Sequence, residues 1–375
     1  MKKQVLRFPL QLGAFLVLAA NGTAASSKQA ITRPQCSFLS PNRPCLNSDL
    51  PGQINAYTKL SFLYWECGER GLDYAVKNRS NQSDSKISVY QPSFKWDPAL
   101  RLVAGYHLPF DNWMIDLTYS FFFQHTHNHV DDSADTFGRG ILSVWTSPKA
   151  FLSGNLFARW REARAKWKIR AQFFDLMLRN DLWNGNTLSF QPACGLKLAT
   201  LQQRYAVSYS GGNTIQLTID DQETFLSSTV NMNNRSFNIG PAAGCGSRWC
   251  LNRRWNLFGT LSGALLASNF HVGRNEFDVS TTAQTIIGSY RNSDHYWTYR
   301  PQGTVQLGIQ WENCSCNKTS VLHYALSASY EAQYWWKQNM LLRHYDAPIA
   351  QSHTQAASQG DLFFQGLTVD LLFDY

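Results

Sequence analysis

Residues 299–312 read YRPQGTVQLGIQWE, and apolar and polar side chains alternate along the whole stretch. One set of alternate positions is apolar and has an aromatic residue at each end: Tyr299, Pro301, Gly303, Val305, Leu307, Ile309 and Trp311. The other set is polar or glycine: Arg300, Gln302, Thr304, Gln306, Gly308, Gln310 and Glu312. Because successive side chains of a β-strand point to opposite faces, this stretch predicts a strand with lipid on one side and water on the other.

The same alternation recurs through the chain, most clearly in residues 113–124, 322–336 and 367–375. It predicts at least ten strands, over residues 54–66, 86–108, 113–124, 158–179, 186–209, 235–247, 255–272, 295–311, 319–337 and 361–375. Long polar connections alternate with short turns, as in bacterial outer-membrane barrels. We therefore predict an all-β fold, a transmembrane antiparallel β-barrel with short periplasmic turns and long outer loops. A soluble β-sandwich is the alternative, but Val, Ile and Leu would dominate its buried face.

The N-terminus predicts export. Lys2, Lys3 and Arg7 precede an apolar stretch over residues 8–20, and small residues follow up to Ala25. The apolar stretch is short for a membrane span, so we expect residues 1–25 to be a cleaved signal peptide rather than an anchor. Residues 26–53, rich in Ser, Pro and Asn, would form a periplasmic segment that is a tail, a plug or an anchor. Residues 54–375 would form the barrel.

Composition agrees with a wall that meets lipid. Of the 375 residues, 14% are aromatic and only 16% are charged, whereas about a quarter of a soluble domain is charged. The net charge of +8 falls to +5 without the three basic residues of the signal peptide, which is too little to indicate a nucleic-acid partner. We expect the protein in the cell outer membrane of a Gram-negative bacterium.

Eight cysteines follow the signal peptide: Cys36, Cys45, Cys67, Cys194, Cys245, Cys250, Cys314 and Cys316. An even number in an oxidising compartment permits disulfides within or between chains. The spacing does not determine which cysteines would pair.

Residues 162–172 place basic side chains at alternate positions. The basic ladder, as we call it, consists of Arg164, Lys166, Lys168 and Arg170. A helix is the alternative, because apolar residues in this segment also recur at helical spacing. The period of two fits all eleven residues, so we predict a strand whose ladder lines the lumen and favours anions. The inward-facing side chains Gln306, Gln310 and Glu331 are the other predicted pore-lining residues.

His125, His127 and His129 precede Asp131 and Asp132. On an extended chain the three imidazoles share a face, a ligand set that zinc accepts. Since the cluster opens a long polar stretch, we interpret it as a solvated rim and predict no metal. The other histidines are scattered, and there is no GxSxG elbow, phosphate-binding loop or dinucleotide fingerprint. We therefore predict no catalytic residues and no cofactor.

Several short motifs occur in order after residue 54: FLYW (62–65), GLDY (71–74), PSFKWDP (92–98), DLMLR (175–179), FQPACGL (190–196), QRY (203–205), YEAQYWW (330–336) and GDLFFQGL (360–367). Together they resemble the major-outer-membrane-protein-like pore-forming proteins of legionellae and chlamydia-related bacteria. The resemblance implies passive diffusion of small solutes and no catalytic residues. In chlamydia-like envelopes it also implies cross-linking of membrane proteins by cysteines.

We thus expect an outer-membrane porin through whose water-filled lumen small solutes and ions diffuse. Its partners would be outer-membrane lipid, small hydrophilic solutes and ions, and the barrel-insertion machinery, with oligomerisation left open. That machinery would recognise the C-terminal signal Leu371, Phe373 and Tyr375. The alternative is a structural or adhesive envelope protein that is anchored by its barrel and cross-linked by disulfides.

Overall fold

The structure, a computed structural model, describes residues 56–81, 84–109, 113–132, 140–146, 157–184, 187–211, 213–215, 225–252, 254–280, 286–316, 321–345, 354–357 and 360–374. The predicted signal peptide and N-terminal segment lie outside the described residues. Among those residues, no helix is both long enough and apolar enough to cross a membrane.

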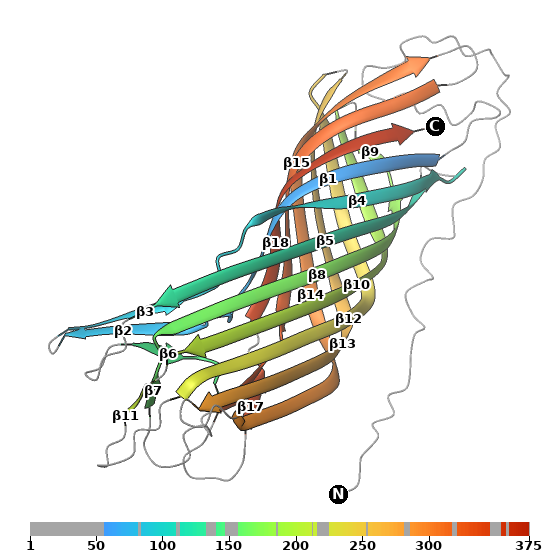
Figure 1. Ribbon diagram of the computed structural model, residues 1–375. Helices are drawn as coiled ribbons and strands as arrows, with labels where there is room; N and C mark the ends of the chain where they lie inside the picture. Colours follow the sequence, from blue (N-terminus) through green and yellow to red (C-terminus); the bar gives the residue numbers. More distant parts are fainter. Residues whose placement is uncertain are drawn as a thin grey trace, which may run out of the picture. The chain divides into compact units, whose positions relative to one another are not determined.

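Ten antiparallel strands form a closed barrel (Figure 1). They are β1 (Ala56–Glu69), β4 (Trp96–His107), β5 (Trp113–Asp131), β8 (Glu162–Asn180), β10 (Leu188–Ser210), β12 (Phe225–Cys250), β13 (Trp255–Ser280), β14 (Ile286–Cys316), β15 (Val321–Asn339) and β18 (Gly360–Asp374). Each strand pairs with the next in chain order, and β18 pairs back with β1. Closure leaves the wall without a free edge, which a sheet in lipid requires. The predicted barrel is confirmed.

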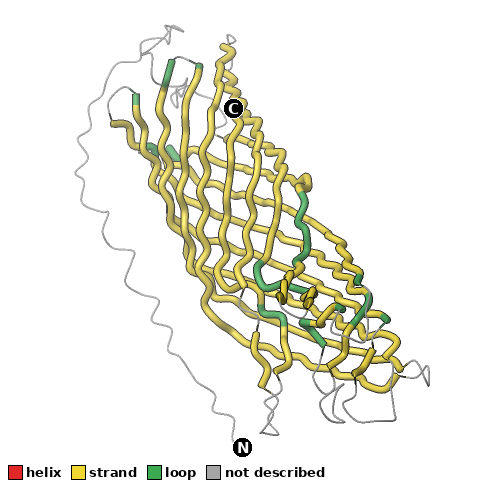
Figure 2. The backbone as a smooth tube through the Cα atoms, turned by 90° about the vertical axis from the view of Figure 1, so that its left-hand side faces the viewer, coloured by secondary structure: helices red, strands yellow, loops and turns green. Residues whose placement is uncertain are grey.

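The outward face of the wall is apolar over the middle of the barrel. In β14, Val305, Leu307 and Ile309 are exposed, and Leu307 has 65% of its surface accessible. The intervening side chains Gln306 and Gln310 point inward and are half-buried. The wall thus has a polar inner face and an apolar outer face, which is the reverse of a soluble protein and is the arrangement expected where the outer face contacts lipid. Figure 2 shows how continuous strands make up the wall.

The two ends of the barrel differ. The first and last described strand residues, Ala56 and Asp374, lie at one end, where the connections between strands are short. Such turns face the periplasm in bacterial barrels, so we call this the periplasmic end. The other, outer end carries the short strands β2 (Ala75–Asn81), β3 (Asp84–Tyr90), β6 (Ile141–Ser143), β7 (Phe157–Arg159), β11 (Asn213–Ile215), β16 (Leu342–Tyr345) and β17 (Thr354–Ala357). The β2–β3 hairpin projects there, away from the C-terminus (Figure 1).

The structure corrects several strand boundaries. The predicted strand 86–108 is two elements, β3 and β4, which are separated by residues 91–95. Residues 225–234, 273–280 and 286–294 fall in predicted long connections, in which a segment around 276–290 was open as a further strand. They extend β12, β13 and β14 at the outer end and form no additional strand. Residues 162–172 belong to strand β8, which confirms the predicted strand and rules out the alternative helix. The short strand β9 (Leu182–Asn184) pairs with β10 at the periplasmic end.

Candidate functional site

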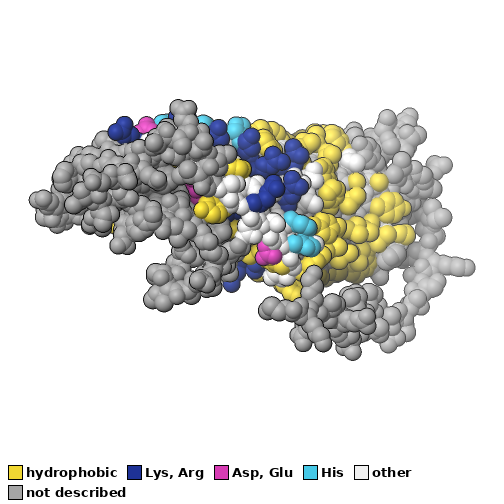
Figure 3. All heavy atoms as spheres, turned by 60° about the horizontal axis from the view of Figure 1, so that its bottom comes forward, with side chains coloured by type: hydrophobic (Ala, Val, Ile, Leu, Met, Phe, Trp, Pro, Cys, Tyr) yellow, Lys and Arg dark blue, Asp and Glu magenta, His cyan; other side chains and the backbone are white. Residues whose placement is uncertain are grey.

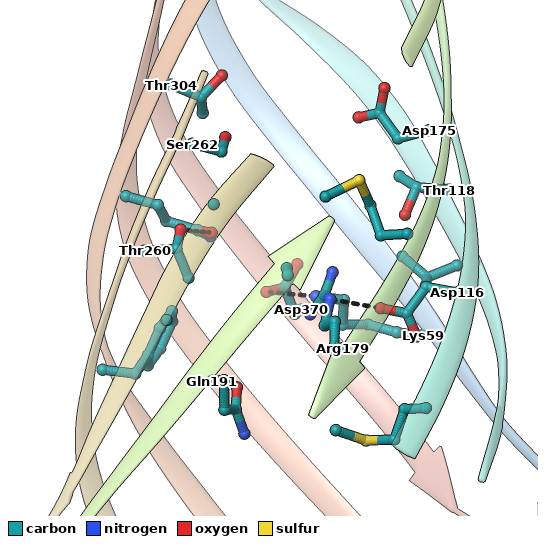
Figure 4. Close-up of a pocket in the computed structure, with 18 of the residues that line it drawn as sticks. Lys59, Asp116, Thr118, Asp175, Arg179, Gln191, Thr260, Ser262, Thr304 and Asp370 are labelled. Carbon is teal, nitrogen blue, oxygen red and sulfur yellow. Dashed lines mark hydrogen bonds and ion pairs between the residues drawn. The ribbon is translucent and has the colours of Figure 1, made fainter. Parts of the chain in front are cut away.

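The lumen encloses a cavity of about 310 Å³ in its periplasmic half (Figure 4). We call it the lumen cavity. It reaches Tyr57, His107 and Asp374, which lie at the periplasmic ends of their strands. Five Lys or Arg side chains and six Asp or Glu side chains line it. The cavity is therefore polar and almost balanced in charge.

Ion pairs between neighbouring strands account for much of this lining. Lys59 Nζ lies 3.8 Å from Asp370, and Figure 4 shows the two side chains pointing toward each other. Arg179 Nε lies 2.6 Å from Asp116, whose side chain is buried. A third pair joins Lys197 and Asp175 at 2.8 Å. Pairing of this kind offsets the cost of placing charges inside a membrane protein.

The pair formed by Arg101 and Glu331 joins two strands of the barrel that are not neighbours. Two intervening strands, β1 and β18, separate their strands β4 and β15. The contact is bidentate, with 2.8 and 2.9 Å between nitrogen and oxygen atoms, the strong geometry for guanidinium and carboxylate. The Arg101 guanidinium also lies 5.3 Å from the centre of the Trp65 ring. Arg101 thus contacts both the lumen cavity and the aromatic side chains that lie nearer the outer end of the barrel.

Inward-facing aromatic side chains fill the lumen toward the outer end. Phe173 lies between Trp335 and Phe364, with ring centroids 5.5 Å away in both cases. Trp65 and Phe122 pack against Phe364 in the same core. Because bulky side chains occupy this level, the polar cavity ends here.

Three segments, two of which contain the short strands β6 and β16, close over this core at the outer end. We call residues 70–75, 140–146 and 340–345 the inner plug. Tyr205 and Tyr209 of β10 donate their hydroxyl hydrogens to the carbonyl oxygens of Leu72 and Tyr74, at 2.6 Å each. Trp145 donates to the carbonyl of Asp73, also at 2.6 Å.

Two arginines add further contacts, one within the inner plug and one from the wall. Arg343, itself part of the inner plug, donates to the Gly71 carbonyl at 2.8 Å and lies 4.3 Å from the centre of the Trp145 ring. Arg274, which is buried in the wall, donates to the carbonyls of Leu342 and Trp145. The wall therefore holds the inner plug mainly through backbone carbonyls.

Comparison with known proteins now places the chain. Residues 50–375 match the family described as Legionella pneumophila major outer membrane protein precursor. The chain belongs to this major outer membrane protein family. Family and fold together locate the protein in the outer membrane of a Gram-negative bacterium. No curated protein matches the chain.

Solved structures resemble this family member only weakly. The outer membrane protease OmpT of Escherichia coli shares 13% identity over 85% of this chain and 96% of its own, with a TM-score of 0.37. A FadL homologue of Pseudomonas aeruginosa shares 9% identity over 86% of this chain and 90% of its own, with a TM-score of 0.27. Neither similarity is strong enough to bear on function.

Three of the predicted pore-lining residues face the lumen of this family member. Gln306, Gln310 and Glu331 all line the lumen cavity. Gln306 donates to the Ser329 hydroxyl at 2.8 Å, and Glu331 holds Arg101. Their inward position follows from the alternation that predicted the strand.

The basic ladder does not line the lumen, and this part of the prediction is corrected. Arg164, Lys166, Lys168 and Arg170 are exposed on the outer face of β8. The residues between them, among them Trp167, are buried against the apolar core. Apolar side chains face inward here because the core and the inner plug, not water, fill the lumen at this level.

The histidine cluster also lies on the outer wall. His125, His127 and His129 are exposed on β5, and Asp132 pairs instead with Lys77 at 3.2 Å. In the described part of the chain, no group of three or more His, Cys, Asp or Glu side chains is placed to hold a metal ion.

Four of the eight cysteines and most of the C-terminal signal lie among the described side chains. Cys67, Cys194, Cys245 and Cys250 are free thiols. Leu371 is exposed on the outer face of β18 and Phe373 is half-buried. Tyr375, the last residue of the predicted insertion signal, lies outside the described residues.

Sequence reasoning missed most of the charged lining. Lys59, Arg101, Asp116, Arg179 and Lys197 were not among the predicted pore residues. Each is a charged residue within an alternating strand. Both chain neighbours are uncharged in all five cases, and both are apolar in three of them. That pattern could have identified them, because a charge on the lipid face of the membrane zone is costly.

Proposed function

We propose that this protein is a narrow channel for passive diffusion of ions and small hydrophilic solutes across the outer membrane. The observation that carries the proposal is the charge-lined lumen cavity. Ions shed part of their hydration at polar groups of a pore lining, and the paired carboxylates and basic groups supply such contacts along the periplasmic half.

The cost of the charges supports a conducting role. Replacing buried ion pairs by well-packed apolar side chains is often neutral or stabilising. A barrel that served only as an anchor could therefore fill its lumen with apolar residues, as this chain does at the level of the aromatic core. A polar lining is useful where water and ions pass.

The inner plug would then set the resistance of the channel. Its attachments are individual hydrogen bonds to carbonyl oxygens, each of which contributes roughly 1 kcal/mol net. A segment held in this way can shift without disrupting the ten-stranded wall. We expect the wild-type channel to show small currents and frequent closures.

Single-channel recording in planar lipid bilayers tests the proposal. In Arg343→Ala, the plug loses the bond to Gly71 and the contact with Trp145, so openings should become longer or larger. Arg254→Ala is the matched control, because Arg254 is exposed in the β12–β13 turn at the periplasmic end. A folded barrel that conducts in neither the wild type nor the plug variant would contradict the proposal.

One observation favours a second function, a structural or adhesive protein anchored by a closed barrel. The outer half of the lumen is filled by the aromatic core and the inner plug. Gels of purified envelopes, run with and without reductant, test this alternative. Thiol-dependent species of high mass would support it, and a single monomer band under both conditions would count against it.

A further inference from the structure

The basic ladder belongs to a larger basic surface on the outside of the barrel. One row of cross-strand neighbours runs from Arg170 through Gln202, Arg235 and His271 to His295, across five strands. A second row, next to the first and nearer the outer end, aligns His125, Lys168 and Arg204. The basic belt, as we call it, comprises His125, His127, His129, Arg164, Lys166, Lys168, Arg170, Arg204, Arg235, His271 and His295, all exposed.

The basic belt begins where the apolar surface ends. Along β8 the outward residues change from Leu176 and Phe174 to Gln172 and then Arg170. Along β10 they change from Leu196 and Leu198 to Thr200, Gln202 and Arg204. On β14 the outward residues toward the outer end are the exposed aromatics Tyr299 and Trp297, followed by His295. Figure 3 shows Lys and Arg side chains, with His beside them, gathered next to a large apolar surface.

This position corresponds to the headgroups of the outer leaflet. Aromatic girdles mark the interfaces of outer-membrane barrels, and the belt lies just beyond such aromatics, toward the end with long loops. The side chains therefore meet the polar part of the lipid and not its acyl chains. Long Lys and Arg side chains suit this level because their aliphatic stems cover apolar surface while their charged groups stay in the polar headgroup layer.

Most of the Lys and Arg side chains of the belt lack a carboxylate partner in the part of the chain that the structure describes, whereas His129 lies 4.0 Å from Asp131 and His295 is hydrogen-bonded to Asn269. Among the described residues, Arg164 pairs with Glu162, and no carboxylate lies within 4.0 Å of Lys166, Lys168, Arg170, Arg204 or Arg235. In the lumen, by contrast, Lys59, Arg101, Arg179 and Lys197 each hold an acidic partner. Like charges on directly opposed strand positions, such as Lys168 and Arg204, destabilise a sheet. An external anion would offset that repulsion.

We propose that the basic belt binds the phosphate groups of phosphorylated lipids in the outer leaflet. Neighbouring strands are about 5 Å apart, so Lys168, Arg170 and Arg204 can approach one phosphate together. Arg and Lys donate charge-assisted hydrogen bonds to phosphate oxygens. A flat belt continuous with the apolar wall fits a lipid whose chains lie along that wall, whereas a soluble anion would gain nothing from the adjoining apolar surface.

The test uses the full chain, folded in neutral detergent, and diphosphorylated lipid A as the probe. Native mass spectrometry counts bound lipid A, and the same lipid without its phosphates is compared. The triple variant Lys166→Gln, Lys168→Gln, Arg170→Gln should weaken lipid A binding on the order of a hundredfold. The single variants Lys168→Gln and Arg254→Gln form a matched pair, of which only the first should weaken binding. Heat-modified migration on gels verifies that each variant is folded.

The outcomes separate the sources of the anion. Strong binding of lipid A, weak binding of the dephosphorylated lipid and loss in the triple variant support the proposal. Equal binding of both lipids, or no loss in a folded triple variant, overturns it. If inorganic phosphate alone displaces lipid A, or if a soluble polyanion binds while lipid A does not, the belt recognises soluble anions and the lipid assignment is wrong.

Discussion

The bidentate pair of Arg101 and Glu331 allows the charge-lined lumen to be tested quantitatively. In Arg101→Met, Glu331 loses two charge-assisted hydrogen bonds and keeps the bond from Gln333 at 2.9 Å. Only 11% of the Arg101 side chain and 3% of the Glu331 side chain are exposed. Removing one partner of a buried pair costs about 3–5 kcal/mol. Because the lumen cavity borders this pair, we expect about 3 kcal/mol, the lower end of the range.

A double-mutant cycle isolates the pair from other effects. Glu331→Gln alone leaves Arg101 without its carboxylate and should also destabilise the barrel. The double variant removes both charges, so its loss of unfolding free energy should be about 1–3 kcal/mol smaller than the sum of the single losses. The assay is urea unfolding of the barrel in lipid vesicles, followed by tryptophan fluorescence. Losses that add to within about 0.5 kcal/mol would refute the coupling inferred from the contact.

Three further predictions follow from which face each side chain occupies. Asp116→Asn leaves Arg179 with a neutral neighbour in the lumen and should shift the reversal potential in a salt gradient toward anion preference. Lys168→Gln on the outer face should leave the reversal potential unchanged. A shift only in Lys168→Gln would instead support a basic ladder that lines the lumen. Val305→Arg puts a charge on the lipid face, midway between Tyr299 and Trp311, and should lower the unfolding free energy by about 2–4 kcal/mol in the vesicle assay. Gln306→Arg faces the lumen cavity and should lower it far less. Equal losses of unfolding free energy in the two variants would contradict the assigned faces. A lipid-soluble maleimide should label the exposed Cys194 quickly and the buried Cys67 only after unfolding, as read by mass spectrometry, and rapid labelling of Cys67 would show that the apolar core is open.

The number and order of the strands could be predicted because lipid and water impose opposite demands on alternate side chains. Where that contrast disappears, the prediction fails. In the first residues of β12, Asn231 and Asn233 point outward, and the inward face mixes the apolar Val230 and Met232 with the polar Asn234. The contrast between the two faces is therefore weak, and the stretch resembles a loop. These residues lie beyond the membrane, where water meets the outer face of the wall.

The basic ladder shows a second limit of periodicity. Alternation indicates that Arg164 to Arg170 share a face, but it does not say which face that is. Within the membrane zone the polar face of a strand is the inner one, and the same rule was applied to the ladder. Trp167 and Ile169 point inward only because Trp65, Phe122 and the inner plug fill the lumen at that level. Those contacts join residues from distant parts of the chain, which no local pattern reveals.

The passage of ions through this lumen can be tested most directly by modifying one residue on each face of the same strand. In a chain whose own cysteines are replaced by serine, Gln306→Cys places a thiol in the lumen cavity and Val305→Cys places one on the lipid face. A charged, water-soluble thiol reagent is added during single-channel recording. We predict that the current through the Gln306→Cys channel falls and that the current through the Val305→Cys channel is unchanged. An unaffected Gln306→Cys current, or equal block of both channels, would contradict conduction through the lumen.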